Sequence, residues 1–391
     1  MAALYSERTD ARSVLAIASA ALGLAACSLL YDPGDFSTKS TTNDELQGPD
    51  PCTHAGLAPK PTVDDGPDEP PKVYAARDLA MVVADRNTVG YDLDGVCTCT
   101  GVGPSDKPGA VRRGASSCAP RRQGDRLCDA EGGRDNAGAA ILQNRLPDKP
   151  GASFDTGYRS AAENGLAGLL FAISEYDGRP DDPQVRVESF YSPGLDPLKG
   201  CAGTVPSSGK NTLGGPRPTW DGCDAWRVGE SFQQGGVGRA GTRDAWVTSG
   251  KLYARFPALR IAVDRTYVTF VDARVEAELV RAVPGAPSRL SKGVIAGSVR
   301  AEELLLGFGE LRTGADGGPL CTTPAFASLV EDTCANLDMA LRTSEPGSTA
   351  PCDAASLVLT FDATAALRGS VAKEEPVVSA CAAAGIVPSC R

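Results

Sequence analysis

The sequence predicts a mainly β protein, an antiparallel β-sandwich of jelly-roll type that is stapled by disulfides and carries short helical insertions. Residues 271–279 give the clearest sign, because apolar side chains occupy every second position and charged ones lie between them. This period of two is typical of a strand with one buried and one solvated face, as in antiparallel sheets. Turn signals separate such runs, and thirteen cysteines can supply the staples.

The strand around residues 271–279 extends over Thr269–Leu279, and seven further runs predict strands of the same sheet system. Turn or loop signals lie between most of them, such as Asp177-Gly178, the glycine-rich stretch 228–242 and Pro284-Gly285. The seven runs are Val73–Ala84, Leu166–Tyr176, Gln184–Phe190, Trp246–Arg255, Leu259–Val263, Gly293–Val299 and Ser356–Ala363.

Three helices are expected among these strands. Asp135 can cap a helix over Asn136–Leu146, and the other two cover Ala301–Leu311 and Ala325–Leu341. Runs with strand patterns continue almost to the end of the chain, so we expect no separate helical domain in its last third.

Composition divides the chain into residues 1–26, a segment 27–71 and a β-rich body 72–391, within which a subdivision near residue 235 stays open. Residues 28–71 contain eight prolines, nine acidic residues and two basic residues, so they carry −7 of the net charge of −10. Such a segment buries too little apolar surface to offset its chain entropy. We therefore expect a flexible, acidic, solvated stalk in front of the body.

The N-terminal 27 residues carry the most specific motif. An apolar run over residues 13–23 follows two arginines; it is too short to span a bilayer but suits the hydrophobic region of a signal peptide. The run ends in Leu24-Ala25-Ala26-Cys27, which closely resembles the lipobox of bacterial lipoproteins. The resemblance covers these positions only, and the body resembles no characterised family.

The lipobox resemblance implies that residues 1–26 are a signal peptide and that the thiol of Cys27 is acylated, with palmitate as one of the acyl chains. Ser28, rather than an aspartate, follows the cysteine. By the same resemblance this implies anchoring at the outer membrane, on its periplasmic or its surface-exposed face. The alternative is cleavage after an Ala-x-Ala sequence by the ordinary signal peptidase, which would give a free secreted protein.

If Cys27 is acylated, twelve cysteines remain, an even number, as a fully disulfide-bonded exported domain needs. Zinc is a poor alternative, because the chain has one histidine and no paired Cys-x-x-Cys set. Spacing suggests the local pairs Cys118–Cys128, Cys201–Cys223 and Cys321–Cys334, although sequence alone leaves the connectivity open. The twelve are Cys52, Cys97, Cys99, Cys118, Cys128, Cys201, Cys223, Cys321, Cys334, Cys352, Cys381 and Cys390.

The residues that the chain lacks argue against several classes of function. His54 is the only histidine and lies in the proline-rich stalk, where we expect no fixed ring, so Ser-His-Asp and Cys-His catalysis are excluded. No Gly-x-Ser-x-Gly elbow is present. The body has no basic stripe, which argues against nucleic acid as a partner.

No cofactor is required by the sequence, and calcium is the ligand that it favours most. Asp92-Leu93-Asp94-Gly95 places the carboxylates of Asp92 and Asp94 on one side of an extended segment, before a glycine that lets the chain bend. The downstream acid of a full calcium loop is absent. Turn and capping roles explain this cluster and two others without metal. The two others are Asp129, Glu131, Asp135 and Asn136, and Asp177, Asp181 and Asp182.

These observations predict a non-catalytic binding or structural role in the cell envelope, with the membrane as partner through the lipid and a glycan or an envelope protein as ligand. The segment Trp220–Trp226 can stack on sugars, but a Trp beside a disulfide more often belongs to a core. The alternative is a carboxylate-dependent enzyme that acts on envelope or extracellular polysaccharide through Glu175, Asp177 or Glu188. It requires two carboxylates that face one groove about 5–10 Å apart.

Overall fold

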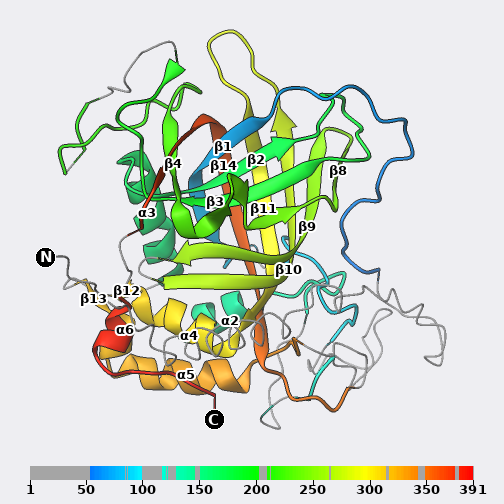
Figure 1. The fold of residues 1–391 in the computed structure, drawn as a ribbon. Coiled ribbons are helices and arrows are strands. Elements are labelled where there is room, and N and C mark those ends of the chain that lie inside the picture. The colour runs from blue at the N-terminus through cyan, green and yellow to red at the C-terminus, as the bar shows by residue number, and fades with distance from the viewer. Residues whose placement is uncertain are drawn as a thin grey trace, which may run out of the picture. The chain divides into compact units, whose positions relative to one another are not determined.

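One ten-stranded sheet organises the body of the protein (Figure 1). The computed structural model describes residues 53–83, 85, 87–98, 117–119, 121, 129–145, 150–201, 209–211, 213–263, 266–313, 317–341, 348–374 and 378–390. These residues belong to one unit, Asp50–Arg391, and strands from both sides of residue 235 share the sheet. The predicted mainly β, antiparallel, disulfide-stapled class is confirmed.

The long strand β14 lies at the centre of the sheet, where it pairs with β1 on one side and β11 on the other. Neighbours along the sheet are antiparallel, and β4 (Ala225–Gly229) adds a parallel pairing to the end of β14. In sheet order the strands are β7 (Ala240–Thr242), β3 (Arg186–Ser192), β2 (Gly168–Ser174), β1 (Lys72–Met81), β14 (Ala354–Ala372), β11 (Arg289–Arg300), β10 (Thr266–Val280), β9 (Lys251–Val263) and β8 (Ala245–Thr248).

The two ends of this sheet are joined by hydrogen bonds. Val247 of β8 exchanges two backbone hydrogen bonds with Asp182, at 2.8 and 2.9 Å, shortly before β3 begins. The N–H of Val185 also donates to the carbonyl of Ala245 at 3.0 Å. The sheet therefore folds over its own core, so that its two halves enclose the apolar side chains as the two layers of a sandwich do.

Burial follows the alternation of the strands. Along β10, buried and partly exposed residues alternate, as the sequence pattern predicts. In β2, by contrast, the first six residues are all buried, because both faces of this strand are covered. Phe171 faces the main core against Phe361, with ring centroids 5.0 Å apart, whereas Leu170 faces a second core with Trp226.

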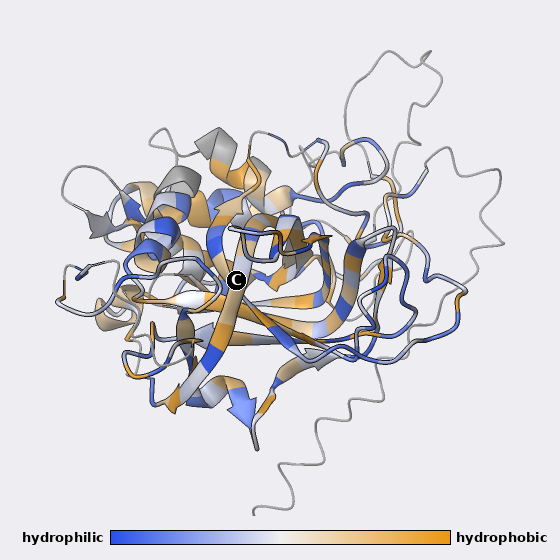
Figure 2. Ribbon diagram, turned by 90° about the horizontal axis from the view of Figure 1, so that it is seen from above, coloured by the Kyte–Doolittle hydropathy of each residue, from blue (hydrophilic) through white to orange (hydrophobic). Residues whose placement is uncertain are grey.

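Helices gather mainly at one end of the sheet, where α2, α4, α5 and α6 lie together in Figure 1, while α3 packs on β1. Figure 2 shows hydrophobic and hydrophilic segments alternating along these helices and strands. The helices are α2 (Ala137–Arg145), α3 (Pro150–Glu163), α4 (Ala301–Glu310), α5 (Ala325–Ala335), α6 (Ala380–Ala383) and the 3-10 turns η3 (Glu230–Phe232) and η4 (Leu320–Thr322). Two small hairpins are β5 (Gln233–Gln234) with β6 (Val237–Gly238) and β12 (Arg312–Thr313) with β13 (Gly318–Pro319).

Several element boundaries differ from the sequence prediction. The expected strand Leu259–Val263 is the end of β9, and β14 continues the expected strand Ser356–Ala363 as far as Ala372. The expected strand Trp246–Arg255 is a hairpin of β8 and β9, because Ser249 and Gly250 both have positive φ and form a two-residue turn. The helix expected over Ala325–Leu341 ends at Ala335.

Four disulfides are formed within the described residues, and they correct part of the expected pairing. Cys201–Cys223 is confirmed. The pairs Cys118–Cys128 and Cys321–Cys334 are wrong, since strands and helices bring together cysteines that are distant in sequence. The pairs formed are Cys118–Cys352, Cys321–Cys381 and Cys334–Cys390. Cys27, Cys52, Cys99 and Cys128 lie outside the described residues.

Residues 53–71 form an irregular segment that is hydrogen-bonded to the body, so the expected solvated stalk is corrected over this part. We call this segment the strap; it is drawn in blue in Figure 1. Trp246 Nε1 donates to the carbonyl of Ala58 at 3.1 Å, and the hydroxyl of Thr248 donates to that of Pro59 at 3.0 Å. The N–H of Glu69 donates to the carbonyl of Tyr176 at 2.7 Å. Residues 27–52 lie outside the described residues.

Candidate metal centre

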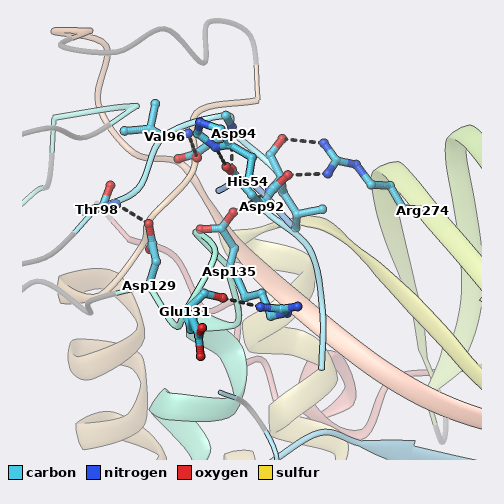
Figure 3. A network of polar contacts seen from close by, with 12 residues as sticks. His54, Asp92, Asp94, Val96, Thr98, Asp129, Glu131, Asp135 and Arg274 are labelled. Atoms are coloured by element: carbon cyan, nitrogen blue, oxygen red, sulfur yellow. Dashed lines mark hydrogen bonds and ion pairs between the residues drawn. The ribbon is translucent and has the colours of Figure 1, made fainter. Parts of the chain in front are cut away.

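The loop that follows β1 brings a group of acidic side chains onto the outer face of β11 and β14. Tyr91 and Val82 fix this loop by packing against Val294, Ala296 and Val358 on that face. The loop backbone is held again by Arg274 of β10, whose guanidinium donates to the carbonyls at positions 92 and 93 (Figure 3). The acidic residues therefore sit on a braced loop rather than on a free one.

Three carboxylates converge on this loop. One oxygen each of Asp92, Asp94 and Asp135 lies within 4.8 Å of the other two. Asp92 and Asp135 are only 3 % and 2 % exposed. The predicted pair Asp92 and Asp94 is thus brought together with a member of the second predicted cluster.

Backbone N–H groups orient each of the three carboxylates. Asp92 accepts from the N–H of Gly95 at 2.7 Å, and Asp94 accepts from that of Val96 at 2.8 Å. Asp135 accepts from the N–H of Leu93 at 2.6 Å. Gly95 has φ +75°, so the glycine expected to let the chain bend does so in the left-handed region.

Two more aspartates lie next to these three carboxylates and add to the negative charge of the cluster. Asp129 accepts from the N–H of Thr98, and Asp338 accepts from the N–H of Ser356 at 2.8 Å and from its hydroxyl at 2.5 Å. Burial, followed by the charges of neighbouring aspartates, raises the pKa of Asp129 to about 9. Burial also raises the pKa of Asp338 to about 6.

The same causes act on the inner carboxylates. Burial and then the charges of Asp92 and Asp338 raise the pKa of Asp94 to about 7, against the hydrogen bonds that it accepts. Burial and the charges of Asp94 and Asp129 raise the pKa of Asp135 well above its usual range. Protons or a cation that reduce this negative charge would therefore stabilise the cluster.

His54 is also part of this neighbourhood, which corrects the expectation that the stalk leaves its ring unfixed. Its Nδ1 contacts the carboxylate of Asp92, and the strap is further held there by two backbone hydrogen bonds through Ala55. The sulfur of Cys97 lies close to both side chains, but Cys97 is disulfide-bonded and offers no thiolate to a metal.

The geometry and the donor type fit calcium. Calcium binds oxygen ligands at about 2.3–2.6 Å, so two oxygens on one ion lie at most about 5 Å apart. The separation of up to 4.8 Å among the three carboxylates meets this limit. Oxygen-only donors suit calcium or magnesium better than zinc or copper.

The remaining members of the predicted clusters lie elsewhere. Glu131 is exposed, and Asn136 donates from Nδ2 to the carbonyl of Val82 at 2.9 Å. A separate acidic group is formed by Asp177 and Asp182 with Asp65 of the strap, while Asp181 accepts from the N–H of Ser249.

The three acids proposed for a carbohydrate-active enzyme are each engaged by an arginine. Glu175 pairs with Arg243 at 2.6 Å, and Glu188 pairs with Arg186 at 3.0 Å. Asp177 pairs with Arg179. Each of these carboxylates therefore has an arginine as its charged partner.

The aromatic segment belongs to the core rather than to an open sugar platform. Trp226 is fully buried in the second core, and Trp220 packs against it with ring centroids 5.6 Å apart.

Sequence reasoning missed His54 and Asp338 as members of the centre. Neither stands in a motif with Asp92: His54 lies 38 positions away, and Asp338 comes from the segment after α5. Comparisons with protein-family models, curated proteins and solved structures found no match. Within the described ranges, no helix is both long and apolar enough to cross a membrane.

Proposed function

We propose that this protein is a lipid-anchored protein of the cell envelope with a non-catalytic binding or structural role, and that calcium bound by Asp92, Asp94 and Asp135 stabilises its body. The convergence of these three carboxylates is the observation that carries the calcium proposal. The Leu24–Cys27 motif supports the anchor, and disulfides support export to an oxidising compartment.

Electrostatics explain why a divalent cation suits this place. Without a cation, the aspartates must hold protons at neutral pH or repel one another, as their raised pKa values indicate. Arg274 contacts the loop but donates to backbone carbonyls and not to the carboxylates. His54 contacts Asp92 alone among the three converging carboxylates in the described part of the chain. A bound calcium would neutralise two charges and use the oxygens that the backbone already orients.

Thermal unfolding of the purified chain at pH 7.5, with calcium and with a chelator, tests the metal proposal. A calcium concentration 100-fold above Kd should stabilise the fold by about 2.7 kcal/mol. Asp94→Asn and Asp135→Asn should lose this response, whereas Asp68→Asn, an exposed acid of the strap, should keep it. A wild-type melting curve that is identical in calcium and chelator contradicts the proposal.

Membrane fractionation of wild type and Cys27→Ser tests the anchor separately. Wild type should partition into the outer membrane, because several acyl chains on one cysteine anchor a protein stably. Cys27→Ser should be found in the soluble fraction. Equal partitioning of the two proteins would show that Cys27 carries no anchor.

A further inference from the structure

A cavity of about 300 Å³ lies away from the metal centre, between α3, the start of β2, the end of β9 and β12. None of the residues that line it belongs to the acidic cluster. Its floor is apolar: Phe154, Leu169, Ile261 and Leu311 line it and are each at most 5 % exposed. Such a floor favours an apolar ligand surface.

The mouth of the cavity is basic. Arg260 and Arg312 line it, and both are exposed. The guanidinium of Arg260 lies 4.0 Å from the ring centroid of Tyr267 and 5.4 Å from that of Phe232. Two aromatic rings thus hold this cation, and among the described residues no carboxylate forms an ion pair with it.

The charge at the mouth and the apolar floor together indicate the class of ligand. Arginine presents a planar fork of donors that matches a carboxylate. Glu374 does not line the cavity, but its charge, in addition to burial, raises the pKa of the lining residue Tyr191 and of Tyr267. The two arginines that line the cavity outweigh this single acid. The mouth therefore attracts an anion, while the floor accepts a hydrocarbon.

We propose that this cavity binds a small organic anion with an apolar body, of the class of medium-chain fatty acids. The carboxylate would lie at Arg260 and Arg312, and the chain would lie along Phe154, Leu169 and Ile261. At about 30 Å³ for each water-sized group, the volume accommodates roughly ten non-hydrogen atoms. Octanoate has that size, and it is the probe that we choose.

Calorimetric titration of the full chain with octanoate tests this site, with octanol and acetate as the matched uncharged and short ligands. Octanoate should bind at least tenfold more tightly than either. Arg260→Met with Arg312→Met should weaken octanoate at least tenfold, whereas Arg289→Met, an exposed arginine of β11, should have no effect. Ala161→Phe, or Ala262→Phe if the first variant unfolds, should abolish binding by filling the cavity.

Three results would overturn the proposal: no octanoate binding to the wild type, equal affinity for octanoate and octanol, or binding that survives the filled cavity in a variant with an unchanged melting temperature. Calcium and chelator should leave octanoate affinity unchanged, so this test is independent of the metal centre.

Discussion

Cys118 and Cys352 are 234 positions apart in the sequence, and a disulfide joins them with their Cα atoms 5.1 Å apart. Backbone hydrogen bonds from Ala119 to Ala350 and from Cys352 to Ala119 flank the bond, at 2.6 and 2.9 Å. The bond therefore fixes a segment beside the metal centre to the residues just before β14.

Removal of this disulfide should destabilise the protein more than removal of a local one. The entropy model predicts a difference of roughly 2 kcal/mol between Cys118→Ala with Cys352→Ala and Cys201→Ala with Cys223→Ala, because the sequence separations are 234 and 22. Urea unfolding of the two double variants measures this difference. Equal losses would mean that loop length does not set the stabilisation.

The acidic centre should make stability depend on pH in a way that calcium removes. In chelator, the raised pKa values of Asp338, Asp94 and Asp129, about 6, 7 and 9, mean that the folded state binds protons which the unfolded state has lost. This stability is complete below about pH 4 and is lost as pH rises through those values. Melting temperatures from pH 5 to 9 should fall in chelator and much less in calcium. Parallel falls in both buffers contradict the metal proposal.

Asp196 connects the segment after β3 to the end of β14. Burial opposes its ionisation, but hydrogen bonds from the hydroxyl and N–H of Ser370 and from the N–H of Leu198 lower its pKa. Asp196→Asn should cost about 1.5–3 kcal/mol at pH 7, a loss that shrinks as pH falls through the pKa of the folded carboxyl. Urea unfolding measures it, with the exposed Asp221→Asn as control; equal effects of the two changes would be evidence against this role.

Gly293 gives space to the ring of Phe361. A Cβ at position 293 would lie 2.4 Å from that ring, whereas a Cβ at Gly318 would meet no heavy atom within 4 Å. Gly293→Ala should therefore lower the free energy of unfolding by about 1–3 kcal/mol. Gly318→Ala should leave the melting temperature almost unchanged. A similar shift for both variants would show that the ring can move away at little cost.

The sequence predicted most strands of the sheet, because the alternation of apolar and polar residues along a strand can be read from that strand alone. The strict alternation around Val275 marks β10 correctly. No helix was predicted over α3, which begins at Pro150 and contains Gly157, two residue types of low helix propensity. Tertiary contacts hold it: the hydroxyl of Tyr158 donates to the carbonyl of Ala76 at 3.2 Å.

The candidate site was predictable only in its local part. Asp92 and Asp94 stand in one short motif, so sequence alone could propose them. Asp135 was assigned to another cluster, and Asp338 to none, because their approach depends on how α2 and β14 are placed. The disulfide pairing was equally hard to predict, because partners such as Cys321 and Cys381 are 60 positions apart in the sequence.

The strap has a mechanical consequence. It has no regular partner strand, so its contacts at Ala55, Ala58 and Glu69 can break one at a time when the N-terminal end is pulled. Its nineteen residues, once released, reach about 65 Å at roughly 3.4 Å per residue. Tension on its N-terminal end would extend the strap before it loaded β1. With the anchor proposed at Cys27, the body would then move away from the membrane without unfolding.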